Sequence, residues 1–152
     1  MLRHSLATLA YRAAKVLRDA PLDFSGFRAS RETRTPGQIL AHMGDLLEWG
    51  LSLANGQEAW QNSRPLRWDS EVERFWRTLA AFDQRLASAV PVAAPAERLF
   101  AGPIADALAH TGQIAMLRRL AGSPVRGENY FRAEISTGRV GMEQAAPVVE
   151  FD

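Results

Sequence analysis

The sequence of 152 residues contains no cysteine. Disulfide bonds, thiolate nucleophiles and thiolate metal ligands are therefore excluded from its chemistry. Any metal site in the chain must draw its ligands from histidine, aspartate and glutamate. Histidine is scarce as well, because the chain has only three, His4, His42 and His110. Few residues could form such a site, so the positions of these three are informative.

The chain also lacks an excess of charge of either sign and has no long apolar run. Its 18 basic residues are offset by 17 acidic ones, which gives a net charge of +1, and Lys15 is the only lysine. This balance gives no electrostatic reason to expect a nucleic acid or an anionic membrane as a partner. No stretch approaches the roughly 20 apolar residues of a transmembrane helix, and no signal peptide is recognisable. We therefore expect a cytoplasmic protein that binds neither nucleic acid nor membrane.

Helical apolar spacing recurs through the sequence, whereas strand patterns are nearly absent. The spacing and the breakers between segments predict four helices: Leu2 to about Asp19, Pro36 to Leu53 or Ala54, about Asp69 to the residues before Pro91, and Gly102-Pro103 to Gly122. A short helical turn is also expected at 97–100. After Pro124 the periodicity is lost, and a turn near Gly138 is expected there.

The second predicted helix has the clearest boundaries. Thr35 is a candidate N-cap, Pro36 suits the first helical position, and Gln38 completes a capping box. At the other end, Asn55-Gly56 is a good C-terminal stop signal. We therefore expect this helix to present its side chains at well-defined positions.

Four amphipathic helices must bury their apolar faces against one another, and a four-helix bundle is the simplest all-α arrangement that does so. The linkers between the first three helices are longer than a tight helical hairpin needs, which favours at least one crossover connection. We expect residues 1–122 to form the bundle. Residues 123–152 should form an irregular C-terminal arm, with a short strand at most, packed on the same domain.

The second predicted helix points His42 into the core. At about 100° per residue, the apolar residues within roughly 60° of His42 are Ile39, Leu46, Trp49 and Leu53. Asp45 lies at the edge of this face, about 60° to one side of His42. An imidazole therefore occupies the middle of a face that must be buried.

The fourth predicted helix repeats this pattern. Asp106, His110 and Gln113 fall within about 40° of one another, on a face that Leu117 continues. Burying such polar groups without partners costs a few kcal/mol each, so they should have partners. His42 on the second helix is the obvious one.

Two histidines and a carboxylate at one point suit a divalent transition metal such as zinc, nickel, iron or manganese. Asp106 and His110 are one helical turn apart, so both can reach the same ion. Asp45 and Gln113 are candidates to orient a ligand beside it, and Trp49 is a candidate to line an adjoining pocket. A second interpretation stays open, in which these residues are only a hydrogen-bonded core group and an Asp–His pair on one helix.

The segment Ala109-His110-Thr111-Gly112-Gln113-Ile114, together with Leu40-Ala41-His42-Met43, resembles the DinB-like superfamily, also called the YfiT-like metal-dependent hydrolases. This family is distinct from the DNA polymerase of similar name. The resemblance spans roughly residues 1–122. The segment from Gly122 to Phe131 resembles one subgroup of the superfamily.

The resemblance implies a four-helix bundle with a crossover, a homodimer and a divalent metal held by three histidines. His42 matches the first of these histidines and His110 the last. The middle position is Asp106, which keeps an oxygen ligand one turn from His110 but departs from the family pattern. Relatives include thiol transferases that use bacillithiol or mycothiol, and a maleylpyruvate isomerase.

Two hypotheses for function follow. In the first, the chain is a metal-dependent enzyme that transfers a low-molecular-weight thiol or hydrolyses a small-molecule substrate, with the metal on His42, Asp106 and His110. In the second, it is a non-catalytic, dimeric, stress-associated binding protein whose metal site is degenerate. A nucleic-acid-binding function is disfavoured by the balanced charge. The sequence names neither the metal nor the substrate.

Overall fold

The computed structural model describes residues 1–151 and is predominantly helical, which confirms the prediction of an all-α protein. Its helical elements are α1 (Leu2–Leu17), the 3-10 turn η1 (Phe24–Gly26), α2 (Pro36–Ala54), α3 (Trp68–Ala87), α4 (Ala96–Leu99), the π-helical segment η2 (Phe100–Ile104) and α5 (Ala105–Leu120). Two short strands, β1 (Gly127–Glu128) and β2 (Glu150–Phe151), pair in antiparallel orientation near the C-terminus.

The start of α2 carries the predicted capping box. The hydroxyl oxygen of Thr35 accepts a hydrogen bond of 3.2 Å from the backbone N–H of Gln38. The side-chain oxygen of Gln38 in turn accepts one of 2.9 Å from the N–H of Thr35. The helix ends at Ala54, directly before the predicted stop. Both ends are therefore set by local residues, which fixes the position of His42 on the helix.

The predicted start of the last long helix was wrong. The chain is helical from Ala96 through α4, η2 and α5 without interruption, and Pro103 lies inside η2 instead of opening the helix. The wider hydrogen-bond spacing of a π-helical segment accommodates a proline, which has no N–H to donate. Gly102 allows close packing here, since a Cβ atom on it would lie 3.3 Å from the ring of Trp49.

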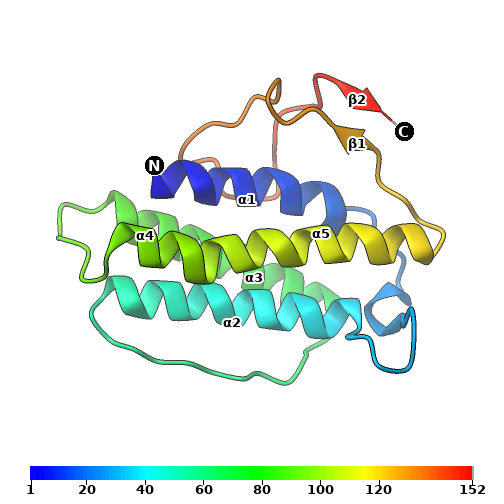
Figure 1. Ribbon diagram of the computed structural model, residues 1–152, viewed down its shortest axis with the longest axis horizontal. Coiled ribbons are helices and arrows are strands. Elements are labelled where there is room, and N and C mark those ends of the chain that lie inside the picture. The colour runs from blue at the N-terminus through cyan, green and yellow to red at the C-terminus, as the bar shows by residue number, and fades with distance from the viewer. Residues whose placement is uncertain (152) are drawn as a thin grey trace.

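The long helices pack around one core. α1 contacts α3 and α5, and α2 contacts the same two helices, so that α1 and α2 lie on opposite sides of them (Figure 1). The largest fully buried side chains come from all of these segments and include Leu6, Leu9, Phe24, Leu40, Met43, Leu47, Phe75, Leu79, Phe82 and Ile114. This packing fixes α2 against α5, the two helices that carry the histidines.

Arg118 on α5 caps the end of α1. Its guanidinium donates to the backbone carbonyls of Val16 (3.2 Å), Arg18 (2.6 Å) and Asp19 (3.2 Å). The helix ends at Leu17, two residues before the predicted end, and Asp19 adopts a positive φ of 52°. A buried cation thus satisfies the carbonyl groups that a helix C-terminus leaves without partners.

The C-terminal arm lies along α1 (Figure 1). The buried carboxylate of Glu128 accepts hydrogen bonds from the Tyr11 hydroxyl (2.7 Å) and from Lys15 (2.9 Å). Lys15 also donates to Glu150 at 2.6 Å, and a turn with positive φ occurs at Gly138 as predicted. Among the helices of residues 1–151, none combines the length and apolar character that a membrane crossing requires.

Candidate metal centre

His42, Asp106 and His110 come together between α2 and α5. The Nε2 atom of His42 lies 3.7 Å from one carboxylate oxygen of Asp106, and the Nε2 atom of His110 lies 3.4 Å from the other. The two imidazole rings have their centroids 4.9 Å apart and are nearly perpendicular. Each residue offers one ligand atom, and these three atoms all lie within 4.8 Å of one another. The third histidine, His4, lies elsewhere, near Thr137.

The cluster is buried on its histidine side and open on its aspartate side. The side chains of His110 and His42 retain 11% and 21% of their exposure, whereas that of Asp106 retains 47%. A small molecule could therefore approach the three groups from the side of Asp106. The protein encloses the remainder of the cluster.

Gln113 fixes the orientation of the His110 ring. Its side-chain oxygen lies 2.8 Å from Nδ1 of His110, and a carbonyl oxygen can only accept a hydrogen bond. The Nδ1 atom therefore carries a proton, so in the neutral tautomer the lone pair belongs to Nε2, the ring atom that faces Asp106. Gln113 thus contacts a candidate metal ligand, and its expected role in orienting a bound ligand stays a prediction.

The surroundings of His42 favour its neutral form. Burial lowers the pKa of His42 below its ordinary value, and the electrostatic influence of His110 and Arg34 lowers it further. The carboxylates of Asp106 and Asp45 oppose this shift without cancelling it. A neutral imidazole is the form that binds a metal ion.

Two tryptophans border the cluster. The ring of Trp60 meets that of His42 edge-on at a centroid distance of 5.7 Å, and Trp49 meets Trp60 in the same way at 5.8 Å. Trp49 also lies beside Gly102, and its expected place in the lining of a pocket stays a prediction. Trp60 belongs to the segment between α2 and α3, where no periodicity could have shown which way its side chain points.

Asp45 lines the pocket beside His42, and its expected role in orienting a ligand stays a prediction. One of its carboxylate oxygens is paired with the buried Arg74 of α3, and the other accepts a hydrogen bond of 2.9 Å from the backbone N–H of Ser63. Arg74 also binds Glu48 at 3.0 Å and lies 3.5 Å from the buried Glu71. One oxygen of Asp45 therefore anchors the segment that carries Trp60, and the other pairs α2 with α3.

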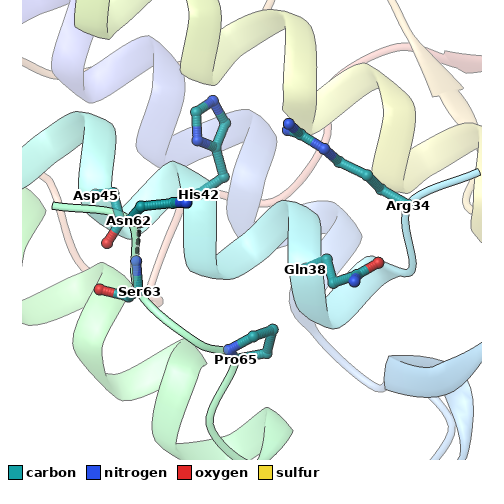
Figure 2. A pocket seen from close by; sticks show the side chains of 7 residues that line it. All are labelled: Arg34, Gln38, His42, Asp45, Asn62, Ser63 and Pro65. Atoms are coloured by element: carbon teal, nitrogen blue, oxygen red, sulfur yellow. Dashed lines mark hydrogen bonds between the residues drawn. The ribbon is translucent and has the colours of Figure 1, made fainter.

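Two pockets border the histidines of the cluster, one beside His42 and one beside His110. The first, of about 170 Å³, is polar and is lined by Arg34, Gln38, His42, Asp45, Asn62, Ser63 and Pro65 (Figure 2). The second, of about 490 Å³, is largely apolar and is lined by Ala29, Thr33, Arg34, Ile39, His110, Gln113, Met116, Leu117 and Leu120. Arg34 lines both pockets. Sequence reasoning missed it because it ends a loop without any periodic pattern.

The chain was compared with protein families, curated proteins and solved structures. No protein-family model, curated protein or solved structure matches the chain. The functional argument therefore depends on the residues of the site.

Proposed function

We propose that the protein is a metal-dependent enzyme of the DinB-like type and that His42, Asp106 and His110 hold a divalent metal. The observation that carries this proposal is the convergence of three ligand atoms, from two helices, within 4.8 Å. Two imidazole nitrogens and one carboxylate oxygen suit zinc, nickel, iron or manganese and leave coordination positions free for a substrate.

The donor set fits a metal better than it fits a hydrogen-bonded core group. The nitrogen–oxygen distances of 3.4 and 3.7 Å exceed the roughly 2.7–3.2 Å of N–H···O hydrogen bonds. Within residues 1–151, the two Nε2 atoms and the Asp106 carboxylate therefore converge without a hydrogen bond between them, at distances that form ion pairs only when a histidine is protonated. Such an arrangement is expected of ligands that surround a common centre.

The proposed reaction is the transfer of a low-molecular-weight thiol to an electrophile, or the hydrolysis of a small-molecule substrate. When bound, a divalent metal supplies a Lewis acid that lowers the pKa of a water or thiol. The residues of the chain prepare the site. Gln113 fixes Nδ1 of His110 as a hydrogen-bond donor, burial lowers the pKa of His42 and so favours its neutral form, and Trp60 covers one side of His42.

The finer description of the fold belongs to the same proposal. A four-helix bundle with a crossover is supported by the contacts, because α1 and α2 both pack against α3 and α5 and are joined by a long connection. A homodimer with a cytoplasmic location is part of this proposal and comes from the sequence resemblance. The oligomeric state can be measured by light scattering.

Calorimetric titration with metal ions tests the proposal. We expect chelator-treated protein without a histidine tag to bind one equivalent of zinc, nickel or manganese and to melt at a higher temperature when loaded. His42→Gln and His110→Gln should abolish this binding, whereas the matched variant His4→Gln should keep it. Turnover is then assayed by thiol transfer from mycothiol or bacillithiol to monochlorobimane.

The outcomes separate the two hypotheses. If no metal binds or stabilises the protein, the proposal fails, and the residues form the degenerate site of a non-catalytic, dimeric binding protein. If metal binds but neither thiol transfer nor ester hydrolysis occurs, the proposed reaction class is wrong although the metal centre exists.

A further inference from the structure

Arg34 stands at the junction of the two pockets beside the cluster. It is the residue that lines both the polar pocket next to His42 and the apolar pocket next to His110. Figure 2 shows the His42 ring, from the first half of α2, and the Arg34 guanidinium, from the loop that precedes α2, both pointing toward α5. A molecule bound at this junction would contact the cluster and the guanidinium together.

The charge of Arg34 has no partner in the part of the chain that the structure describes. Among residues 1–151, no hydrogen bond or ion pair reaches its guanidinium, in contrast to the fully paired Arg74 and Arg118. Arg34 also lies just before the N-terminus of α2, where the helix dipole disfavours a cation. Its placement therefore does not stabilise the helix, and its charge is available to a ligand.

The backbone on both sides of Arg34 is held in place. On one side, Arg28 donates to the carbonyl of Thr33 at 2.7 Å, and the Thr33 hydroxyl donates to the carbonyl of Ser30 at 2.9 Å. On the other side, the Thr35–Gln38 capping box fixes the chain. A preorganised anchor loses less entropy when a ligand binds than a flexible one does.

The apolar pocket beside Arg34 has the size and surface of a ligand site. Its volume of about 490 Å³ lies within the range of small-molecule pockets, roughly 300–1,000 Å³. Met116 and Leu120 each remain 57% exposed at its opening, and Leu117 and Ile39 form its buried part. No carboxylate of the described residues lines this pocket, so the guanidinium of Arg34 gives it a positive charge.

From this arrangement we propose that the substrate is an amphipathic anion, a small molecule with an apolar body and a carboxylate. The carboxylate binds Arg34, the apolar body occupies the pocket along α5, and the reacting group faces the His42–Asp106–His110 cluster. This inference rests on the proposed enzyme function and specifies its class of substrate. A second copy of the chain is the alternative occupant, and charge complementarity to Arg34 argues for the small anion.

Binding of octanoate tests this inference. Chelator-treated protein is titrated with octanoate, with the neutral octanamide and with the short-chain butyrate, and amide shifts are followed by NMR. We expect octanoate to move the resonances of Ile39, Gln113 and Leu117 and to bind at least tenfold more tightly than octanamide, because the amide has no negative charge and only one oxygen to accept from the guanidinium. Butyrate should bind more weakly than octanoate, since less apolar surface is buried.

Two variants with the same change in charge localise the effect. Arg34→Gln should weaken octanoate binding about tenfold and remove the preference over octanamide. Arg31→Gln, in the same loop but outside both pockets, should bind octanoate as the wild type does. Equal losses in the two variants, or equal binding of octanoate and octanamide to the wild type, would overturn the inference.

The same samples keep this inference separate from the proposed function. Octanoate is titrated without metal, and zinc is titrated without octanoate. Zinc binding without octanoate binding would refute the amphipathic-anion substrate and leave the metal enzyme standing. Arg34-dependent octanoate binding without metal binding would refute the metal enzyme and leave the binding site for an amphipathic anion standing. If Leu120→Glu converts a dimer to a monomer and octanoate does not bind, the apolar pocket is an interface between copies, and the inference is wrong.

Discussion

The Nδ1 atom of His110 donates a hydrogen bond of 2.8 Å to the side-chain oxygen of Gln113. The two residues are three apart on α5, so this contact follows directly from helical geometry. It leaves the lone pair of Nε2 directed toward Asp106, 3.4 Å away. The hydrogen bond to Gln113 thus orients the His110 ring without any metal ion.

Replacing Gln113 should weaken metal binding without removing a ligand. Gln113→Leu deletes the acceptor that holds the His110 tautomer, and loss of such a contact typically lowers metal affinity by roughly 10- to 100-fold. Competition with a chromophoric chelator measures the change. Gln57→Leu, an exposed amide beyond the end of α2, is the matched control and should leave the affinity unaltered. Unchanged affinity in Gln113→Leu would show that the hydrogen bond plays no part in metal binding.

The pKa of His42 should respond in opposite directions to two nearby substitutions. Arg34→Gln removes a positive charge that disfavours the imidazolium, so the pKa of His42 should rise. Asp106→Asn removes a negative charge that favours the imidazolium, so the pKa should fall further. Proton NMR of the imidazole resonances in metal-free protein measures both. A fall in Arg34→Gln or a rise in Asp106→Asn would contradict the electrostatic account of the site.

Trp60 should report metal binding by fluorescence. Its ring centroid lies 5.7 Å from that of His42, so a quenching ion such as nickel or copper bound there would reduce its emission. Trp60→Phe should therefore remove much of the metal-induced quenching. Trp68→Phe is the control, because Trp68 packs against Phe24 and not against the cluster. Equal quenching in both variants would place the ion away from His42.

Arg74 should be important for stability, because it neutralises buried carboxylates. The side chains of Asp45 and Glu71 are 2% and 0% exposed, and both face Arg74. Arg74→Met leaves these charges buried without a counter-ion, which should lower the free energy of unfolding by about 3–5 kcal/mol. Urea denaturation measures this loss. The exposed Arg77→Met, on the same helix, should change it by less than about 0.5 kcal/mol. Similar losses in both variants would show that the buried network contributes little.

Local signals in the sequence predicted much of the fold. The capping box of Thr35 and Gln38 and the stop at Asn55 set α2 correctly, because these contacts involve residues that are neighbours in the chain. Pro103 misled the prediction for the last helix, because proline usually begins a helix and the π-helical segment that absorbs it has no sequence signature. The packing of α1 and α2 against the same two helices required the structure.

The sequence predicted that the three residues at the centre of the candidate site face one another, but it did not identify the loop residues beside them. Helical periodicity alone placed His42, Asp106 and His110 on facing surfaces, and the structure brings their ligand atoms within 4.8 Å. Trp60 and Arg34 lie in loops, where side-chain direction depends on tertiary contacts and not on a repeating angle. Asp45 faces inward as its position suggested, but the partner that occupies it, Arg74, is 29 residues away in sequence.

Anomalous diffraction from crystals grown with zinc tests the central claim most directly. The proposed function predicts one anomalous peak at roughly 2.0–2.2 Å from Nε2 of His42, Nε2 of His110 and a carboxylate oxygen of Asp106. His4→Gln crystals should keep this peak, and His110→Gln crystals should lose it. An absence of density among the three residues at neutral pH and saturating zinc, with the histidines hydrogen-bonded to Asp106 instead, would contradict the proposed metal centre.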